Sequence, residues 1–137
     1  MSVLEEGIYA YLANFANLTA KVGTKIYPIQ FPQSTTMPCV VYQRIDTPRD
    51  LTHDTSGATG DLTYPRFQFE VWAETYKAGK EITDILRSAL NGKTGTLSGG
   101  GVSVTIRAAL ANNETVEYSP EFELYRFLND YIIWIEE

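Results

Sequence analysis

The sequence predicts an α+β fold in which two helices pack on one face of an antiparallel four-stranded sheet. Two segments carry apolar residues at helical spacing, and other segments alternate apolar with polar residues as half-buried strands do. The chain has 137 residues and is 44% hydrophobic, which is enough for one core. The expected order is helix, strand, strand, helix, strand, strand. Because no internal linker or repeat is visible, we expect a single domain over residues 1–137, with a long mobile loop at about 47–63.

The first helix is expected from Ser2 to Asn14. Ser2 and Glu5 match the S-x-x-E capping box. The apolar residues of this segment recur on one face: Leu4, Ile8, Leu12 and Phe15. Gly7 weakens the helix by about 1 kcal/mol relative to alanine. A further helical turn is expected at residues 18–22, ended by Gly23.

An extended connector is expected next, because Ile26-Tyr27-Pro28 and Phe31-Pro32 contain prolines that avoid helix. Residues 39–45 are rich in β-branched and aromatic residues and predict the first strand. Residues 47–63 show no periodicity and few large apolar residues, so they predict the long loop.

The second strand, residues 66–73, has the clearest alternation in the chain. Phe67, Phe69 and Val71 share one face. The other face carries Arg66, Gln68, Glu70 and Trp72. If the phenylalanine face lies under the helices, Trp72 faces the open side of the sheet. There it either packs under the connector that follows the first helix or lies in a subunit interface, where tryptophan is enriched.

Thr75 is expected to cap the second helix, which runs to about Leu90 and ends at Asn91-Gly92. Its apolar stripe is Ile82, Ile85, Leu86, Ala89 and Leu90. A turn is expected at residues 99–101, followed by a third strand over 102–106 and a polar segment up to Pro120. The last strand is expected over residues 124–135, with Asn129 and Asp130 interrupting it as a bulge.

The charge is uneven along the chain. Residues 111–137 hold seven acids and one base, and this difference of six equals the net charge of −6. The sequence therefore lacks the basic footprint that phosphate binding needs. Cys39 is the only cysteine and lies in an apolar run, so a buried thiol is expected. The N-terminal residues do not resemble a signal peptide, and we expect no membrane association.

No residue set predicts catalysis, a cofactor or a metal ion. His53 is the only histidine and falls in the expected mobile loop, where catalytic geometry is hard to hold. Asp46, Asp50, Asp54 and Asp61 lack the spacing of a calcium loop. Glu117, Glu121 and Glu123 are expected on a solvated face rather than in a pocket.

The order of the segments nevertheless resembles one known family. The N-terminal helix is followed by Ile26-Tyr27-Pro28 and then by Met37-Pro38-Cys39-Val40-Val41-Tyr42. After the long loop come Phe67-Gln68-Phe69-Glu70-Val71-Trp72-Ala73 and a helix with Tyr76, and the chain closes with Leu124-Tyr125-Arg126 and Ile133-Trp134-Ile135. These pieces are similar, over essentially the whole chain, to the tail completion proteins of long-tailed bacteriophages and prophages, which include tail terminators and tail-to-head joining proteins.

The resemblance implies a non-enzymatic tail assembly protein. Such proteins form a ring, generally a hexamer, on the head-proximal end of the tail tube, where the ring stops tube growth and meets the head connector or a head completion protein. DNA passes through the ring without sequence-specific binding. Assembly in the bacterial cytoplasm and a final place in the virion tail follow from the same resemblance.

A candidate interface with the ring neighbours or other partners combines the long loop with the polar face of the strand over 66–73. Its residues are Arg49, Asp50, His53, Asp54, Asp61, Arg66, Gln68, Glu70 and Trp72. Two alternatives stay open. One is a small ligand-binding or enzymatic domain with a pocket closed by residues 47–63, and the other is a different tail or baseplate component with the same small fold.

Overall fold

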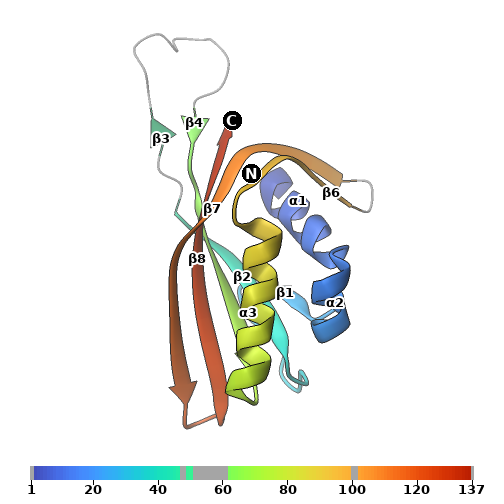
Figure 1. Ribbon diagram of the computed structural model, residues 1–137, viewed down its shortest axis with the longest axis vertical. Coiled ribbons are helices and arrows are strands. Elements are labelled where there is room, and N and C mark those ends of the chain that lie inside the picture. Colours follow the sequence, from blue (N-terminus) through green and yellow to red (C-terminus); the bar gives the residue numbers. More distant parts are fainter. Residues whose placement is uncertain (1, 47–48, 51–61, 100–101, 137) are drawn as a thin grey trace.

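The computed structural model describes residues 2–46, 49–50, 62–99 and 102–136. They form three helices: α1 (Ser2–Ala13), α2 (Ala16–Val22) and α3 (Tyr76–Leu90). They also form eight strands: β1 (Ile26–Pro28), β2 (Cys39–Asp46), β3 (Arg49–Asp50), β4 (Leu62–Thr63), β5 (Arg66–Ala73), β6 (Lys93–Gly99), β7 (Val102–Ser119) and β8 (Leu124–Glu136). Figure 1 shows the long β7–β8 hairpin beside α3.

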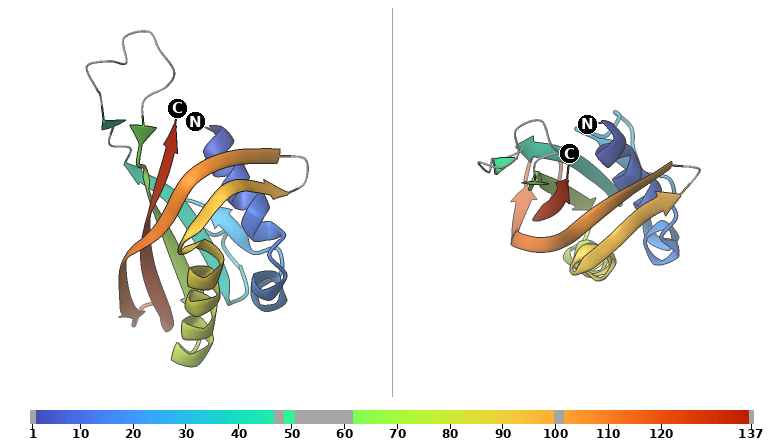
Figure 2. Two further views of the ribbon diagram at one scale, coloured as in Figure 1. Left: turned by 45° about the horizontal axis from the view of Figure 1, so that its top comes forward. Right: turned by 90° about the horizontal axis from the view of Figure 1, so that it is seen from above.

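Six strands build the main sheet in the order β1-β2-β5-β8-β7-β6. β1 runs parallel to β2, whereas the other pairs are antiparallel, so the sheet is mixed. The short strands β3 and β4 pair with each other, and β4 also pairs with the last residues of β8. The sheet curls around the helices as a half-barrel (Figure 2).

The expected four-stranded antiparallel sheet with two helices is therefore wrong. The Ile26–Pro28 connector is extended, as expected, but it pairs with β2 as a parallel strand. The polar residues after Ile106 continue β7 to Ser119, and the segment before the glycines forms β6. Strands that bury only part of one face, or lie at a sheet edge, need little apolar alternation, so the pattern did not reveal them.

The helices follow the sequence more closely. Leu4, Ile8 and Leu12 of α1 are 0–1% exposed, so the predicted stripe faces the sheet. Thr75 caps α3 as predicted, because its side-chain oxygen accepts a hydrogen bond from the Ala78 amide at 3.2 Å. Asn91 and Gly92, the latter with a φ of 82°, end the helix. The predicted turn at 18–22 belongs to α2.

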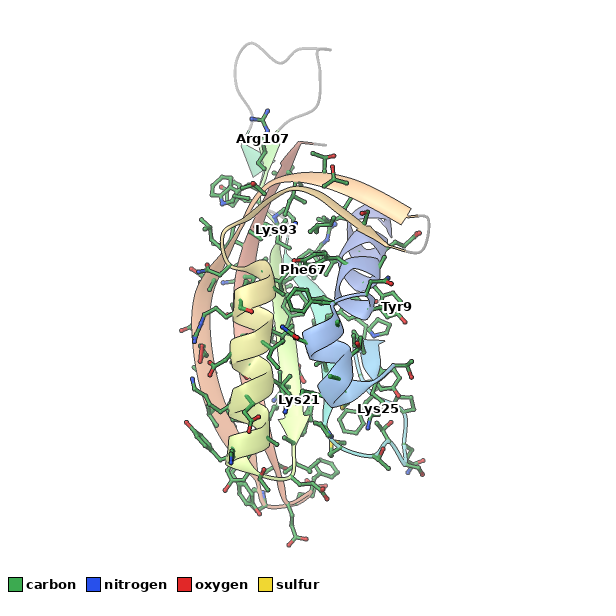
Figure 3. All side chains as sticks on the ribbon, turned by 45° about the vertical axis from the view of Figure 1, so that its right-hand side comes forward. Tyr9, Lys21, Lys25, Phe67, Lys93 and Arg107 are labelled. Atoms are coloured by element: carbon green, nitrogen blue, oxygen red, sulfur yellow. The ribbon has the colours of Figure 1, made fainter. Side chains whose placement is uncertain are left out.

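One face of the sheet holds the core beneath the helices. Phe67, Phe69 and Val71 of β5 are fully buried there, as the alternation predicted, and Phe127 of β8 lies beside them. Figure 3 shows Phe67 between the helices. We call this side the helix-covered face and the other side the open face. Cys39 of β2 is also buried, and because it lies opposite Trp72 it is on the open face.

The predicted bulge at residues 129–130 is misplaced. β8 pairs with β5 without a break from Tyr125 to Ile132, and the irregularity lies on β7, between Ala111 and Asn113. Asn129 is 2% exposed, and its side-chain amide donates to the Phe69 carbonyl at 3.2 Å. A buried amide whose hydrogen bond is satisfied is tolerated in a continuous strand.

Two glycines let the helices approach the sheet closely. A Cβ on Gly7 of α1 would overlap Val104 of β7, and a Cβ on Gly79 of α3 would overlap the ring of Phe127. The weak helix propensity of Gly7 is therefore offset by contact that no larger residue allows.

Candidate interaction surface

The open face carries the polar side chains that the sequence assigned to it. Gln68, Glu70 and Trp72 alternate along β5, opposite Asp130, Leu128 and Arg126 of β8. Side chains directly opposite each other on antiparallel strands lie on the same face, so β8 contributes to this surface beside β5. Charged and aromatic side chains lie there together with the aliphatic Leu128.

Glu70 and Arg126 form the central ion pair of the open face. The Arg126 Nη2 and Nε atoms donate to the two Glu70 carboxylate oxygens at 2.9 and 3.2 Å. Glu70 is 7% exposed, so this carboxylate depends on its partner for solvation. The hydrogen bonds that Arg126 donates to Glu70 raise the pKa of Arg126 above its ordinary value. A second acid, Glu117 of β7, accepts from Arg126 Nη1 at 3.3 Å.

Trp72 completes the cluster around this ion pair. Its indole N–H donates to Glu70 Oε1 at 3.1 Å, and the Arg126 guanidinium lies 5.4 Å from its ring centre. Phe31, from the connector between β1 and β2, meets the Trp72 ring edge-on at 5.3 Å. The connector thus packs on Trp72, which is the first of the two alternatives drawn from the sequence, and Trp72 stays half-buried.

The structure brings together only part of the candidate interface. Gln68 contacts Asp130 at 3.4 Å, and Glu70 contacts Trp72, while Arg66 begins the same strand. Arg49 and Asp50 lie on β3, which pairs with β4 near the end of β8. His53, Asp54 and Asp61 lie outside the described residues, as does most of the loop whose mobility was expected.

An apolar group also lies on the open face, toward the end where β4 joins β8. Tyr64 and Trp134 stack with their ring centres 4.7 Å apart. Leu110 of β7 is 47% exposed and borders the same shallow hollow as Trp134. Alternation in residues 131–135 places Trp134 on the face away from Ile133 and Ile135, but no sequence pattern predicts that Tyr64 contacts it.

The sequence did not predict the far end of the β7–β8 hairpin, since residues 107–119 read as a polar segment. Tyr118 and Tyr125 meet edge-on at 5.0 Å, and Tyr76 of α3 lies 6.1 Å from Tyr125. Val116, Tyr118 and Phe122 are 43%, 50% and 60% exposed. The alternation of Val116 and Tyr118 with Thr115 and Glu117 was the signal that could have predicted a strand here.

A concavity of about 730 Å³ separates the connector from the hairpin end and is lined by Phe31, Thr35, Met37, Glu74, Phe122 and Leu124, among others. Among these lining residues Glu74 is the one charged side chain, and the rest are polar or apolar.

Within the described part of the chain, no cluster of three or more histidine, cysteine or acidic residues could hold a metal ion. None of the described helices is long and apolar enough to cross a membrane.

Comparison with known proteins gives one family and a related structure. The family described as "Tail completion protein gp17" matches residues 6–136. A search of curated proteins finds no match. A chain from the solved structure "Virion of native gene transfer agent (GTA) particle" aligns with a TM-score of 0.80 at 18% identity, covering 98% of this chain and 95% of that one. At this identity the likeness establishes the shared fold.

Proposed function

The chain belongs to the tail completion protein family, and from this premise we propose that it forms a ring, most simply of six copies, on the head-proximal end of a phage tail tube. The family match over residues 6–136 carries the proposal, because it establishes a structural protein of the phage tail. The ring would stop tube growth and present a surface to the head connector or a head completion protein.

Features of the surface support self-association. Large apolar side chains are exposed on the β7–β8 hairpin and on the open face, and such patches on a soluble chain are typical of protein contacts. The net charge of −6 favours a channel through which DNA passes without tight binding, because tight binding to phosphates needs basic side chains. Assembly in the bacterial host followed by incorporation into the virion tail accords with the family.

The test is electron microscopy of tail tubes assembled with and without the purified protein. We expect rings on one end of each tube, tubes of fixed length when the protein is present, and overlong tubes when it is omitted. Tubes of equal length in both samples, with no density at either end, would refute the proposal.

Two other functions are distinguishable in the same experiment. A different tail or baseplate component would appear along the tube or at the end distant from the head. A ligand-binding domain would leave the tubes unchanged.

A further inference from the structure

The C-terminal half of β7 has one edge that pairs with no other strand in the described structure. β6 pairs with β7 only as far as Ala109, and the Ala111 amide is taken by the Asn91 side chain at 2.9 Å. From Asn113 to Ser119, β7 pairs with β8 alone. All of residues 111–118 are exposed. A long free edge offers a row of backbone donors and acceptors to another strand.

Apolar side chains border this edge. Val116 and Tyr118 are 43% and 50% exposed, and Phe122 at the hairpin end is 60% exposed. An added strand would cover the side chains along the edge, so burial would reinforce the backbone hydrogen bonds.

The opposite side of the sheet ends in β1, which is a different kind of edge. The Ile26 amide already bonds the Thr24 carbonyl at 2.9 Å, and Pro28 has no N–H. This edge therefore offers no donor at these two residues. The Pro28 carbonyl is taken by the Gln30 amide at 2.7 Å, so the Ile26 carbonyl is the acceptor that an incoming strand would use. Ile29, directly after β1, is 65% exposed. β1 cannot pair with a second β1, but it complements a strand that supplies N–H groups and apolar side chains.

Charge separates the two edges further. Residues 112–123 hold four acids (Glu114, Glu117, Glu121, Glu123) and no base. Residues 21–45 hold three bases (Lys21, Lys25, Arg44) and no acid. Lys21 and Lys25, labelled in Figure 3, come from α2 and from the residue before β1. Glu114 and Glu117 already pair within the subunit with Lys80, Arg87 and Arg126, as do Lys21 with Glu81 and Arg44 with Glu5. Pairing of two β7 edges would bring Glu121 and Glu123 of the two copies together, whereas β7 against β1 brings these two acids toward Lys25.

We propose that the free edge of β7 in one copy docks against the β1 edge of the next copy, so that the sheet continues from subunit to subunit. The contact is head-to-tail, because it joins two different patches, and a head-to-tail contact closes into a ring when the rotation between copies allows. This inference rests on the proposed function and names the surfaces that would join the ring.

Disulfide trapping tests the contact directly in the purified protein at high concentration. The variant Ile29→Cys/Val116→Cys should give a ladder of covalent oligomers on oxidation, while each single variant gives none. The matched control is Ile29→Cys/Leu110→Cys. Leu110 is on the same strand and 47% exposed, but it precedes the unpaired segment of β7. Cys39 is buried and stays out of the reaction. A dimer from Val116→Cys alone, or a ladder from the control only, overturns the proposal.

Charge reversal supplies the second arm. Glu121→Lys and Lys25→Glu should each weaken self-association about fivefold or more, and the double variant should recover at least part of the loss. Glu6→Lys is the control, since Glu6 is an exposed acid on α1. If wild-type rings form but neither arm responds, the inference fails and the proposed function stands. If tubes are never capped yet the ladder forms, the function fails and the contact stands.

Discussion

Glu70 is a carboxylate on the open face that is nearly closed off from water, since it is 7% exposed. Alternation along β5 predicted its face correctly. It could not predict the partner, because Arg126 is 56 residues away in the sequence. Glu70 and Trp72, proposed from the sequence as contacts with other subunits, are already engaged with Arg126 and with each other. Their role in an interface stays a prediction.

Replacing Glu70 with glutamine should cost about 2 kcal/mol of unfolding free energy, because Arg126 would lose a charged acceptor that is shielded from water. Glu117 is the natural control. It bonds the same Arg126, but its side chain is 57% exposed. Glu117→Gln should therefore cost less than about 0.5 kcal/mol. Urea denaturation of both variants measures the difference, and equal losses would show that burial does not set the strength of these pairs.

Among the helices and strands, those with a deeply buried side were predicted most accurately from the sequence. β5 and α3 were predicted with nearly correct bounds because both have a fully buried side, which imposes a strict apolar period. β6 was missed because it is an edge strand in which Thr94, Thr96 and Ser98 are exposed and Leu97 is the only buried residue described. β7 was ended too early because residues 110–118 are all exposed, so that only the short alternation of Val116 and Tyr118 with polar residues indicates a strand.

At Gly79, where α3 packs on β8, helix propensity and packing should change the free energy of unfolding in opposite directions. Gly79→Ala would favour an isolated helix by about 1 kcal/mol. Here we expect a net loss of about 1–3 kcal/mol, because the new methyl group would overlap the Phe127 ring. Ser88→Ala, at an exposed position of the same helix, is the control and should change stability by less than about 0.5 kcal/mol. Thermal unfolding of the two variants is the measurement. A stabilised Gly79→Ala protein would mean that α3 is free to move off the sheet.

The whole molecule should lose stability at alkaline pH, because the Cys39 thiol and the Tyr131 phenol are buried in their protonated forms. Burial raises the pKa of the Cys39 thiol from 9.0 to about 11 and that of the Tyr131 phenol from 10.0 to about 12. The folded state therefore keeps both protons at a pH where the unfolded chain has released them. Their contribution to stability is complete below about pH 9 and is lost as the pH rises toward 12.

Urea denaturation at several pH values tests this dependence. The midpoint should fall above about pH 9, and it should fall less steeply in Tyr131→Phe, which lacks one of the two protons. If the urea midpoint of Tyr131→Phe falls as steeply with pH as that of the wild type, groups other than Tyr131 cause the loss of stability.

The last strand of the chain lies in the middle of the sheet, which has a consequence for synthesis. β8 pairs with β5 along one edge and with β7 along the other. Until residues 124–136 have left the ribosome, β5 and β7 have no common neighbour, and Phe67 and Phe69 have no Phe127 beside them. The nascent chain should therefore stay open and protease-sensitive until these residues have emerged. A chain stopped before residue 124 should be degraded rather than accumulate as a smaller folded protein.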